Sequence, residues 1–81
     1  MNTNEAELRN IWSELLCIPI DAITTESNFF HLGGNSLAVV QLEFSIKQRF
    51  HVSLSISMLY SCPELKKQVA LIEKALELPP S

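Results

Sequence analysis

Apolar residues at helical spacing occupy three segments of this chain and constrain it to a helical fold. In residues 5–17 they recur every three or four positions, which is typical of a helix with one buried face. Residues 36–50 and 63–77 repeat this spacing, and residues 56–60 suit one short turn of helix. The pattern predicts an all-α fold, a small four-helix bundle with three main helices and a short third helix.

Short sequence signals mark the ends of these helices. Asn4, followed by Glu7 three positions later, predicts a capping box at the start of the first helix, and Pro19 ends that helix. Pro63 suits the first position of the last helix. The buried face expected for the last helix consists of Leu65, Val69, Ile72 and Leu76. Residues 51–57 alternate apolar and polar side chains, so a strand is the alternative there.

Between the first two helices lies a connection, residues 18–35, in which the helical period disappears and turn-forming residues gather. A loop of about 18 residues is unusual in so small a chain, and we expect it to be ordered or functional. The apolar side chains expected to hold this loop against the core are Ile20, Ile23, Phe29, Phe30 and Leu32.

The length of 81 residues allows one domain, with residues 5–77 as its core and 78–81 as a tail or linker. Met1 is typical of a free-standing protein, whereas the prolines near the end favour a linker to a following domain, and both interpretations stay open. The net charge is −3 and no basic stripe is present, which argues against nucleic-acid binding. No apolar run approaches the roughly 18 residues that cross a bilayer. We therefore expect a cytoplasmic protein that does not bind a membrane.

The cysteines and histidines show no spacing typical of a metal site or a redox motif. Cys17 and Cys62 lack the spacing of a metal knuckle or a redox motif, and we expect both to be buried or half-buried. His31 and His51 do not complete a metal site with them, so we expect no metal. We expect His31 to be a solvated loop residue.

The second predicted helix carries two apolar faces. Val39, Leu42, Ile46 and Phe50 lie on one face, which we assign to the core. A second set, on the far side beside Ser36, consists of Leu37, Val40 and Phe44. Either the long loop folds back over this second face, or the face is an exposed patch that binds partners.

Both glycines of the chain, Gly33 and Gly34, stand directly before Asn35 and Ser36. Glycine adopts backbone angles that other residues avoid, and Ser36 falls at the first residue of the helix or at its cap. Free amide groups and the helix dipole stabilise an anion at such a position. The local alternative is that Ser36 serves only as an N-cap.

Two catalytic interpretations of this serine fit the sequence poorly. The string GNSLA resembles a nucleophile elbow, but Ala38 stands where the second glycine belongs, and neither histidine has a recognisable acidic partner. A minimal serine hydrolase therefore remains the weaker alternative, which turnover of an activated ester would reveal. A phosphate-binding loop requires a lysine after the glycines, and none follows.

The block NFFHLGGNSL, residues 28–37, resembles the attachment motif of carrier proteins, specifically the peptidyl carrier (thiolation) domains of nonribosomal peptide synthetases. The similarity extends to apolar positions in and after the second helix, and the string MLYSCPEL, residues 58–65, resembles the junction of the family's third and fourth helices. It covers nearly the whole chain, from Leu8 to about Leu76.

The resemblance implies a function for Ser36. A phosphopantetheinyl transferase would attach the 4′-phosphopantetheine of coenzyme A to this serine, with Gly33, Gly34 and Asn35 as the flanking loop. The domain itself would catalyse nothing and would be a monomer. An adenylation domain would load it, and condensation, tailoring or thioesterase domains would use its cargo. The docking surface implied by the resemblance consists of Leu37, Val40, Phe44, Met58 and Tyr60.

Several positions depart from the family pattern. Asn35 stands where Asp or His is common, His51 stands where a glycine often ends the second helix, and His31 replaces a frequent acidic residue. Glu26 and Ser27 replace a more acidic pair. The LGG string favours the peptidyl class over fatty-acid and polyketide carriers, with an aryl or acyl carrier as the alternative. A small helical interaction domain without a prosthetic group is the competing class.

Overall fold

The helices form in the segments that the apolar spacing predicts. Within residues 3–77, which the computed structural model describes, the α-helices are α1 (Thr3–Leu16), α2 (Ser36–Phe50), α3 (Ile56–Ser61) and α4 (Leu65–Glu77). A short 3-10 turn, η1 (Ile20–Ala22), interrupts the first loop. The described part contains no strand, and the all-α fold is confirmed. The expected tail or linker at residues 78–81 lies outside the described residues.

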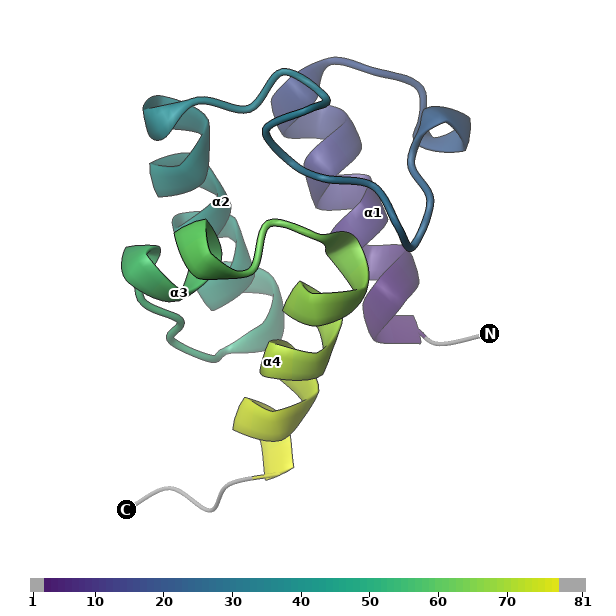
Figure 1. Ribbon diagram of the computed structural model, residues 1–81. Coiled ribbons are helices and arrows are strands. Elements are labelled where there is room, and N and C mark those ends of the chain that lie inside the picture. Colours follow the sequence, from purple (N-terminus) through teal and green to yellow (C-terminus); the bar gives the residue numbers. More distant parts are fainter. Residues whose placement is uncertain (1–2, 78–81) are drawn as a thin grey trace.

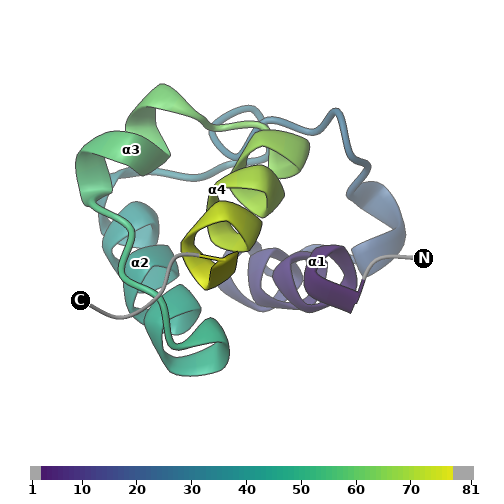
Figure 2. The same cartoon turned by 90° about the horizontal axis from the view of Figure 1, so that it is seen from below.

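One apolar core lies between the helices. Helix α1 packs against α2 and α4, and the short α3 packs against α2 (Figure 1). Seen from below, α4 lies between α1 on one side and α2 with α3 on the other (Figure 2). Every helix and the first loop contribute fully buried side chains, among them Leu8, Trp12, Phe29, Leu42, Ile46, Leu59, Leu65 and Ile72.

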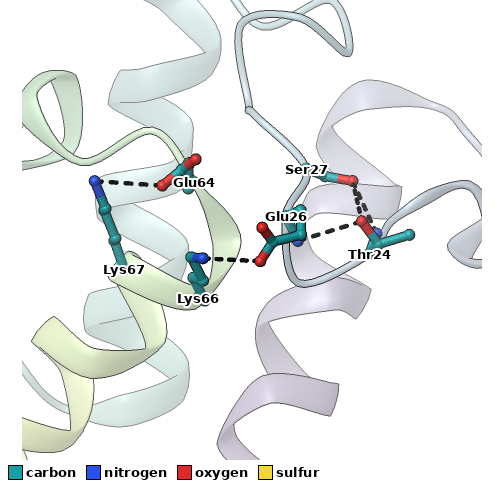
Figure 3. A network of polar contacts seen from close by, with 6 residues as sticks. All are labelled: Thr24, Glu26, Ser27, Glu64, Lys66 and Lys67. Carbon is teal, nitrogen blue, oxygen red and sulfur yellow. Dashed lines mark hydrogen bonds and ion pairs between the residues drawn. The ribbon is translucent and has the colours of Figure 1, made fainter.

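The first loop is ordered by the α4 helix that follows far along the chain. The carbonyl oxygens of Thr25 and Ser27 accept the backbone N–H groups of Lys66 and Leu65, at 3.1 and 3.0 Å. The first N–H groups of a helix lack partners within it, so these loop carbonyls satisfy the start of α4. Figure 3 shows the same junction, where the Lys66 ammonium lies 2.8 Å from the Glu26 carboxylate.

The loop also fills the core as expected, with one exception. Ile23 and Phe29 are buried, and Phe30 and Leu32 pack against the core while partly exposed. The expectation for Ile20 is wrong, because its side chain is 39% exposed on the 3-10 turn.

The expected limits of α1 need correction. Asn4 lies inside the helix, so it is not the N-cap that the sequence predicted. The helix ends at Leu16, and Cys17 follows with a left-handed φ of 56°. The Ile18 N–H then donates to the Ser13 carbonyl at 3.2 Å, which closes the helix end. Cys17 points to solvent in this turn and is exposed rather than buried, whereas Cys62 is half-buried as expected.

The last helix differs from the prediction at its start and in the burial of its last turn. It begins at Leu65, so Pro63 precedes it by two residues and does not occupy its first position. Leu65, Val69 and Ile72 are buried as expected, but Leu76 is 49% exposed. Figure 1 shows why, since the last turn of α4 extends beyond the ends of the neighbouring helices.

The segment after α2 alternates without forming a strand. Val52 and Leu54 are buried and their neighbours are exposed, but the backbone of residues 51–55 has no strand partner within the described chain. His51, which stands where a glycine often ends the second helix, adopts the left-handed conformation, φ 59°, and its N–H donates to the Lys47 carbonyl. No helix within residues 3–77 combines the length and the apolar character that crossing a membrane requires.

Candidate functional site

Asn35, and not Ser36, caps helix α2. The Asn35 backbone is extended, with φ −138° and ψ −174°, and its side-chain oxygen accepts the Ala38 N–H at 2.9 Å. This is the usual geometry of an N-cap residue. The interpretation of Ser36 as the cap is therefore wrong. Ser36 is instead the first residue of the helix, and its hydroxyl has no part in satisfying the helix end.

The Ser36 hydroxyl is exposed and meets a second side chain from another helix. Tyr60, on α3, donates its phenol O–H to the Ser36 Oγ at 3.1 Å. The ring of Tyr60 stacks on the ring of Phe30 in the first loop, with centroids 5.4 Å apart and an interplanar angle of 19°. The first loop, α2 and α3 thus converge at this serine.

The two glycines before the cap serve different structural needs. Gly33 has a φ of +109°, and a Cβ built on it would meet no heavy atom within 4 Å, so its requirement is the backbone angle alone. A Cβ on Gly34 would lie 2.7 Å from the Phe29 carbonyl oxygen and 2.6 Å from a ring carbon of Phe29. Gly34 is therefore required by the close approach of this backbone to Phe29.

The turn that carries these glycines is held by Asn28. Its side-chain oxygen accepts the N–H groups of Phe30 and His31, at 2.9 and 3.3 Å. The Gly34 N–H donates to the Phe29 carbonyl at 2.9 Å, which brings the chain back to the start of α2. The NFFHLGGNS string therefore folds into a fixed turn that delivers Ser36 to the surface.

An apolar surface borders Ser36 on α2 and α3. The first loop does not cover the second face of α2, because Leu37, Val40 and Phe44 are 66%, 47% and 58% exposed. On α3, Met58 and Tyr60 are 38% and 45% exposed, and this helix packs against α2. We call these five residues the apolar face. The interpretation in which the first loop covers the second face of α2 is therefore wrong, and this face is exposed.

The surroundings of Ser36 lack the partners of a catalytic serine. Within residues 3–77, no histidine or carboxylate side chain is hydrogen-bonded to its hydroxyl, and His31 is exposed as expected. A serine nucleophile needs a general base within hydrogen-bond reach. The same described residues contain no group of three His, Cys, Asp or Glu side chains placed to hold a metal ion.

Comparison with known proteins identifies the family. Residues 6–72 match the family model described as a phosphopantetheine attachment site. The chain belongs to this phosphopantetheine attachment family. Ser36 is exposed at the start of α2, and its hydroxyl does not cap the helix, because Asn35 is the N-cap.

Relatives of this phosphopantetheine attachment chain include large synthetases. Tyrocidine synthase 3 from Brevibacillus parabrevis is 38% identical over 77 residues, which cover 94% of this chain and 1% of the synthase. This chain spans between 1% and 5% of the length of the curated relatives that it matches.

Solved structures agree with the carrier-type fold. A non-covalent docking-domain complex of the Pax nonribosomal peptide synthetase is 36% identical, with a TM-score of 0.83 over 93% of this chain and 70% of that one. A peptidyl carrier protein solved in solution has a TM-score of 0.89 over 99% of this chain and 87% of its own. At 22% identity, this second likeness shows the fold alone.

Sequence reasoning missed one contact of this site. The resemblance assigned Tyr60 to the docking surface, but the sequence contained no sign that the Tyr60 hydroxyl would reach Ser36. The two residues are 24 positions apart, and their contact depends on how α3 packs against α2.

Proposed function

We propose that Ser36 is the attachment residue for 4′-phosphopantetheine and that the chain is a non-catalytic peptidyl carrier domain of nonribosomal peptide biosynthesis. One observation carries the assignment to this serine. Ser36 opens α2 with an exposed hydroxyl, while Asn35 supplies the cap that a helix-terminal serine would otherwise provide. A residue that the fold does not need at that position is available for modification.

The attachment reaction uses groups that this site presents. The Ser36 Oγ would bond to the phosphorus next to the pantetheine arm of coenzyme A, and the bond between the two phosphates would break. The 3′,5′-adenosine bisphosphate would leave with the electron pair of that bond, and the Ser36 proton would pass to a base of the transferase. The positive end of α2 stabilises the phosphodiester that results. When bound, the group supplies a flexible thiol that holds the cargo as a thioester.

The flanking residues prepare the serine for this reaction. Gly33 permits the turn, Gly34 lets the chain pack closely on Phe29, and Asn35 ends the turn as the cap. Together they present Ser36 at a defined surface position, which a transferase requires of its protein substrate. Their part in the attachment site is to orient Ser36.

The apolar face is the proposed docking surface for the enzymes that act on the carrier. Burial of one such side chain contributes about 1.5–3 kcal/mol, and the loss of freedom on association offsets a comparable total. A surface of this size therefore favours brief contacts. Such contacts suit a carrier that visits a phosphopantetheinyl transferase, an adenylation domain, and condensation, tailoring or thioesterase domains in turn.

Intact mass spectrometry tests the attachment. The folded protein is incubated with coenzyme A and a broad-specificity phosphopantetheinyl transferase, and we expect a gain of one phosphopantetheine. Ser36→Ala should show no gain, whereas Ser53→Ala, which changes another exposed serine, should be modified like the parent protein. Absence of a gain with more than one transferase, on folded protein, would leave the interaction-domain interpretation in its place.

A further inference from the structure

Tyr60 makes a contact that the proposed attachment alone does not explain. Its phenol O–H donates to the Ser36 Oγ, although both side chains are exposed and water could satisfy each of them. The Tyr60 ring is fixed in place, because it stacks on Phe30, which itself packs against the core. Phe30 also contacts the buried Phe29 edge-on, with centroids 6.0 Å apart. The aromatic series 29, 30 and 60 therefore fixes the direction of the Tyr60 hydroxyl.

Attachment changes the acceptors that this hydroxyl meets. The Ser36 Oγ is a neutral hydroxyl oxygen before the reaction and an ester oxygen after it. The new phosphodiester brings non-bridging oxygens that share a negative charge, and hydrogen bonds to charged oxygens are about twice as strong as neutral ones. A donor already held beside the Ser36 Oγ lies beside the phosphorus that bonds to that oxygen.

We propose that Tyr60 is a positioning residue for the attached group, whose hydroxyl donates to the Ser36 Oγ before attachment and to the phosphodiester afterwards. This inference rests on the proposed attachment at Ser36. Tyr60 holds the phosphodiester end of the arm beside α3. The Phe30 ring, on which Tyr60 stacks, connects this contact to the first loop. The side-chain oxygen of Asn35 accepts the Ala38 N–H and has no proton to donate to the phosphodiester.

The composition of the chain makes the test selective. Tyr60 is the only tyrosine of the 81 residues, so labelling tyrosine at the ring carbon that bears the hydroxyl gives a single NMR signal. The signal is recorded for the unmodified protein, for Ser36→Ala, and for the modified protein after mass spectrometry has shown complete attachment. We expect three different chemical shifts for this ring carbon. The Tyr60 hydroxyl would have a neutral acceptor in the unmodified protein, no side-chain acceptor in Ser36→Ala and a charged acceptor in the modified protein.

Phosphorus NMR supplies the second readout. Tyr60→Phe removes the hydroxyl and keeps the ring that stacks on Phe30, so it is the matched variant. With both proteins modified to completion by excess transferase, we expect the phosphodiester signal of Tyr60→Phe to shift relative to that of the parent protein. Leu76→Ala, on the far end of α4 where the side chain is also exposed, should leave the phosphodiester signal unmoved.

The outcomes separate this inference from the proposed function. No mass gain in the parent protein would overturn the attachment at Ser36 and this inference with it. A mass gain with the same phosphorus signal in both proteins, and an unmoved tyrosine signal on attachment, would overturn the role of Tyr60 and leave the attachment standing. The tyrosine measurement needs no change at position 60, so it decides the matter even if Tyr60→Phe folds poorly.

Discussion

The indole N–H of Trp12 donates a hydrogen bond to the side-chain oxygen of Gln68, 3.1 Å away, in the buried interface of α1 and α4. Both side chains are fully buried. The Gln68 amide nitrogen in turn donates to the Cys62 carbonyl at 3.0 Å, ahead of α4. One polar side chain thus joins α1, α4 and the segment that follows α3, and all of its contacts depend on the correct packing of these elements.

Replacing Gln68 with leucine should destabilise the protein although leucine is apolar. The Trp12 N–H would lose its partner while buried, and the part-buried Cys62 carbonyl would lose its partner as well. An unsatisfied buried group costs about 1–3 kcal/mol. Urea denaturation followed by the fluorescence of Trp12, the single tryptophan, measures the free energy of unfolding. Gln41→Leu makes the same change at an exposed site of α2 and should alter that free energy by less than about 0.5 kcal/mol. Equal effects of the two variants would contradict the prediction.

The two glycines should respond differently to alanine. Gly33→Ala forces a positive φ on a residue with a Cβ, at a cost of about 1–2 kcal/mol. Gly34→Ala should cost more, because its Cβ would collide with the ring and the carbonyl oxygen of Phe29. Thermal unfolding compares the single variants, and Phe29→Leu is then added to each. Phe29→Leu should partly restore the stability lost in Gly34→Ala and should restore none of the stability lost in Gly33→Ala. Equal coupling energies in the two pairs would refute the contact of Gly34 with Phe29 as the cause.

Neighbouring valines on α2 offer a matched test of the apolar face. Val40→Asp lies on the exposed side, where Val40 is 47% exposed, and should change the free energy of unfolding by less than about 0.5 kcal/mol. Val39→Asp places an unpaired charge in the core, where Val39 is 1% exposed, and should cost about 3–5 kcal/mol.

The same Val40→Asp variant should lower the efficiency of modification by a transferase about 10- to 100-fold, since a buried apolar contact of about 1.5–3 kcal/mol is lost. Rates of coenzyme A-dependent mass gain measure this effect. Phe44→Asp should behave in the same way. Loss of cooperative unfolding in either variant would instead assign that residue to the core.

The ion pair of Lys66 and Glu26 should make stability depend on alkaline pH. The hydrogen bond to the Glu26 carboxylate, together with its charge, raises the pKa of Lys66 above its ordinary value of 10.5. The folded state therefore holds this proton more tightly than the unfolded state does. The stabilisation is fully present below pH 10.5 and is lost as the pH rises through the higher pKa of the folded state.

Thermal unfolding from about pH 9 to about pH 12 checks this dependence against Lys66→Met. The difference between the two proteins should shrink across that range, and added salt should reduce it, since the pair is exposed. Glu26→Gln should produce the same loss, and the double variant should lose no more than either single one. A difference that stays constant with pH would show that Lys66 stabilises the protein without its charge.

Helix period alone was sufficient to predict most of this fold. The spacing of apolar residues predicted the limits of α2 and the side chains that it buries, which are Val39, Leu42, Ile46 and Phe50. Local sequence signals did not locate the N-cap of α2, because two neighbouring residues can both fill that role. Asn35 and Ser36 are both good N-caps, and the choice between them depends on where the turn that packs Gly34 on Phe29 ends.

The remaining errors arise from contacts between distant segments. Leu76 continues the apolar spacing of α4, but the last turn of this helix extends beyond the neighbouring helices that would bury it (Figure 1). Cys17 is exposed because a left-handed turn closes α1 there, which spacing does not reveal. The contact of Tyr60 with Ser36 depends on the placement of α3, so no local pattern could have predicted it.

The carbonyls of Thr25 and Ser27 begin a helix that lies about 40 residues further along the chain. A carrier rebuilt by exchanging only its first loop would therefore also exchange the hydrogen-bond acceptors that start α4. Chimeras that transplant residues 18–35 should keep their donor's first turn of α4 as well, because backbone hydrogen bonds and the ion pair of Glu26 with Lys66 join the two segments.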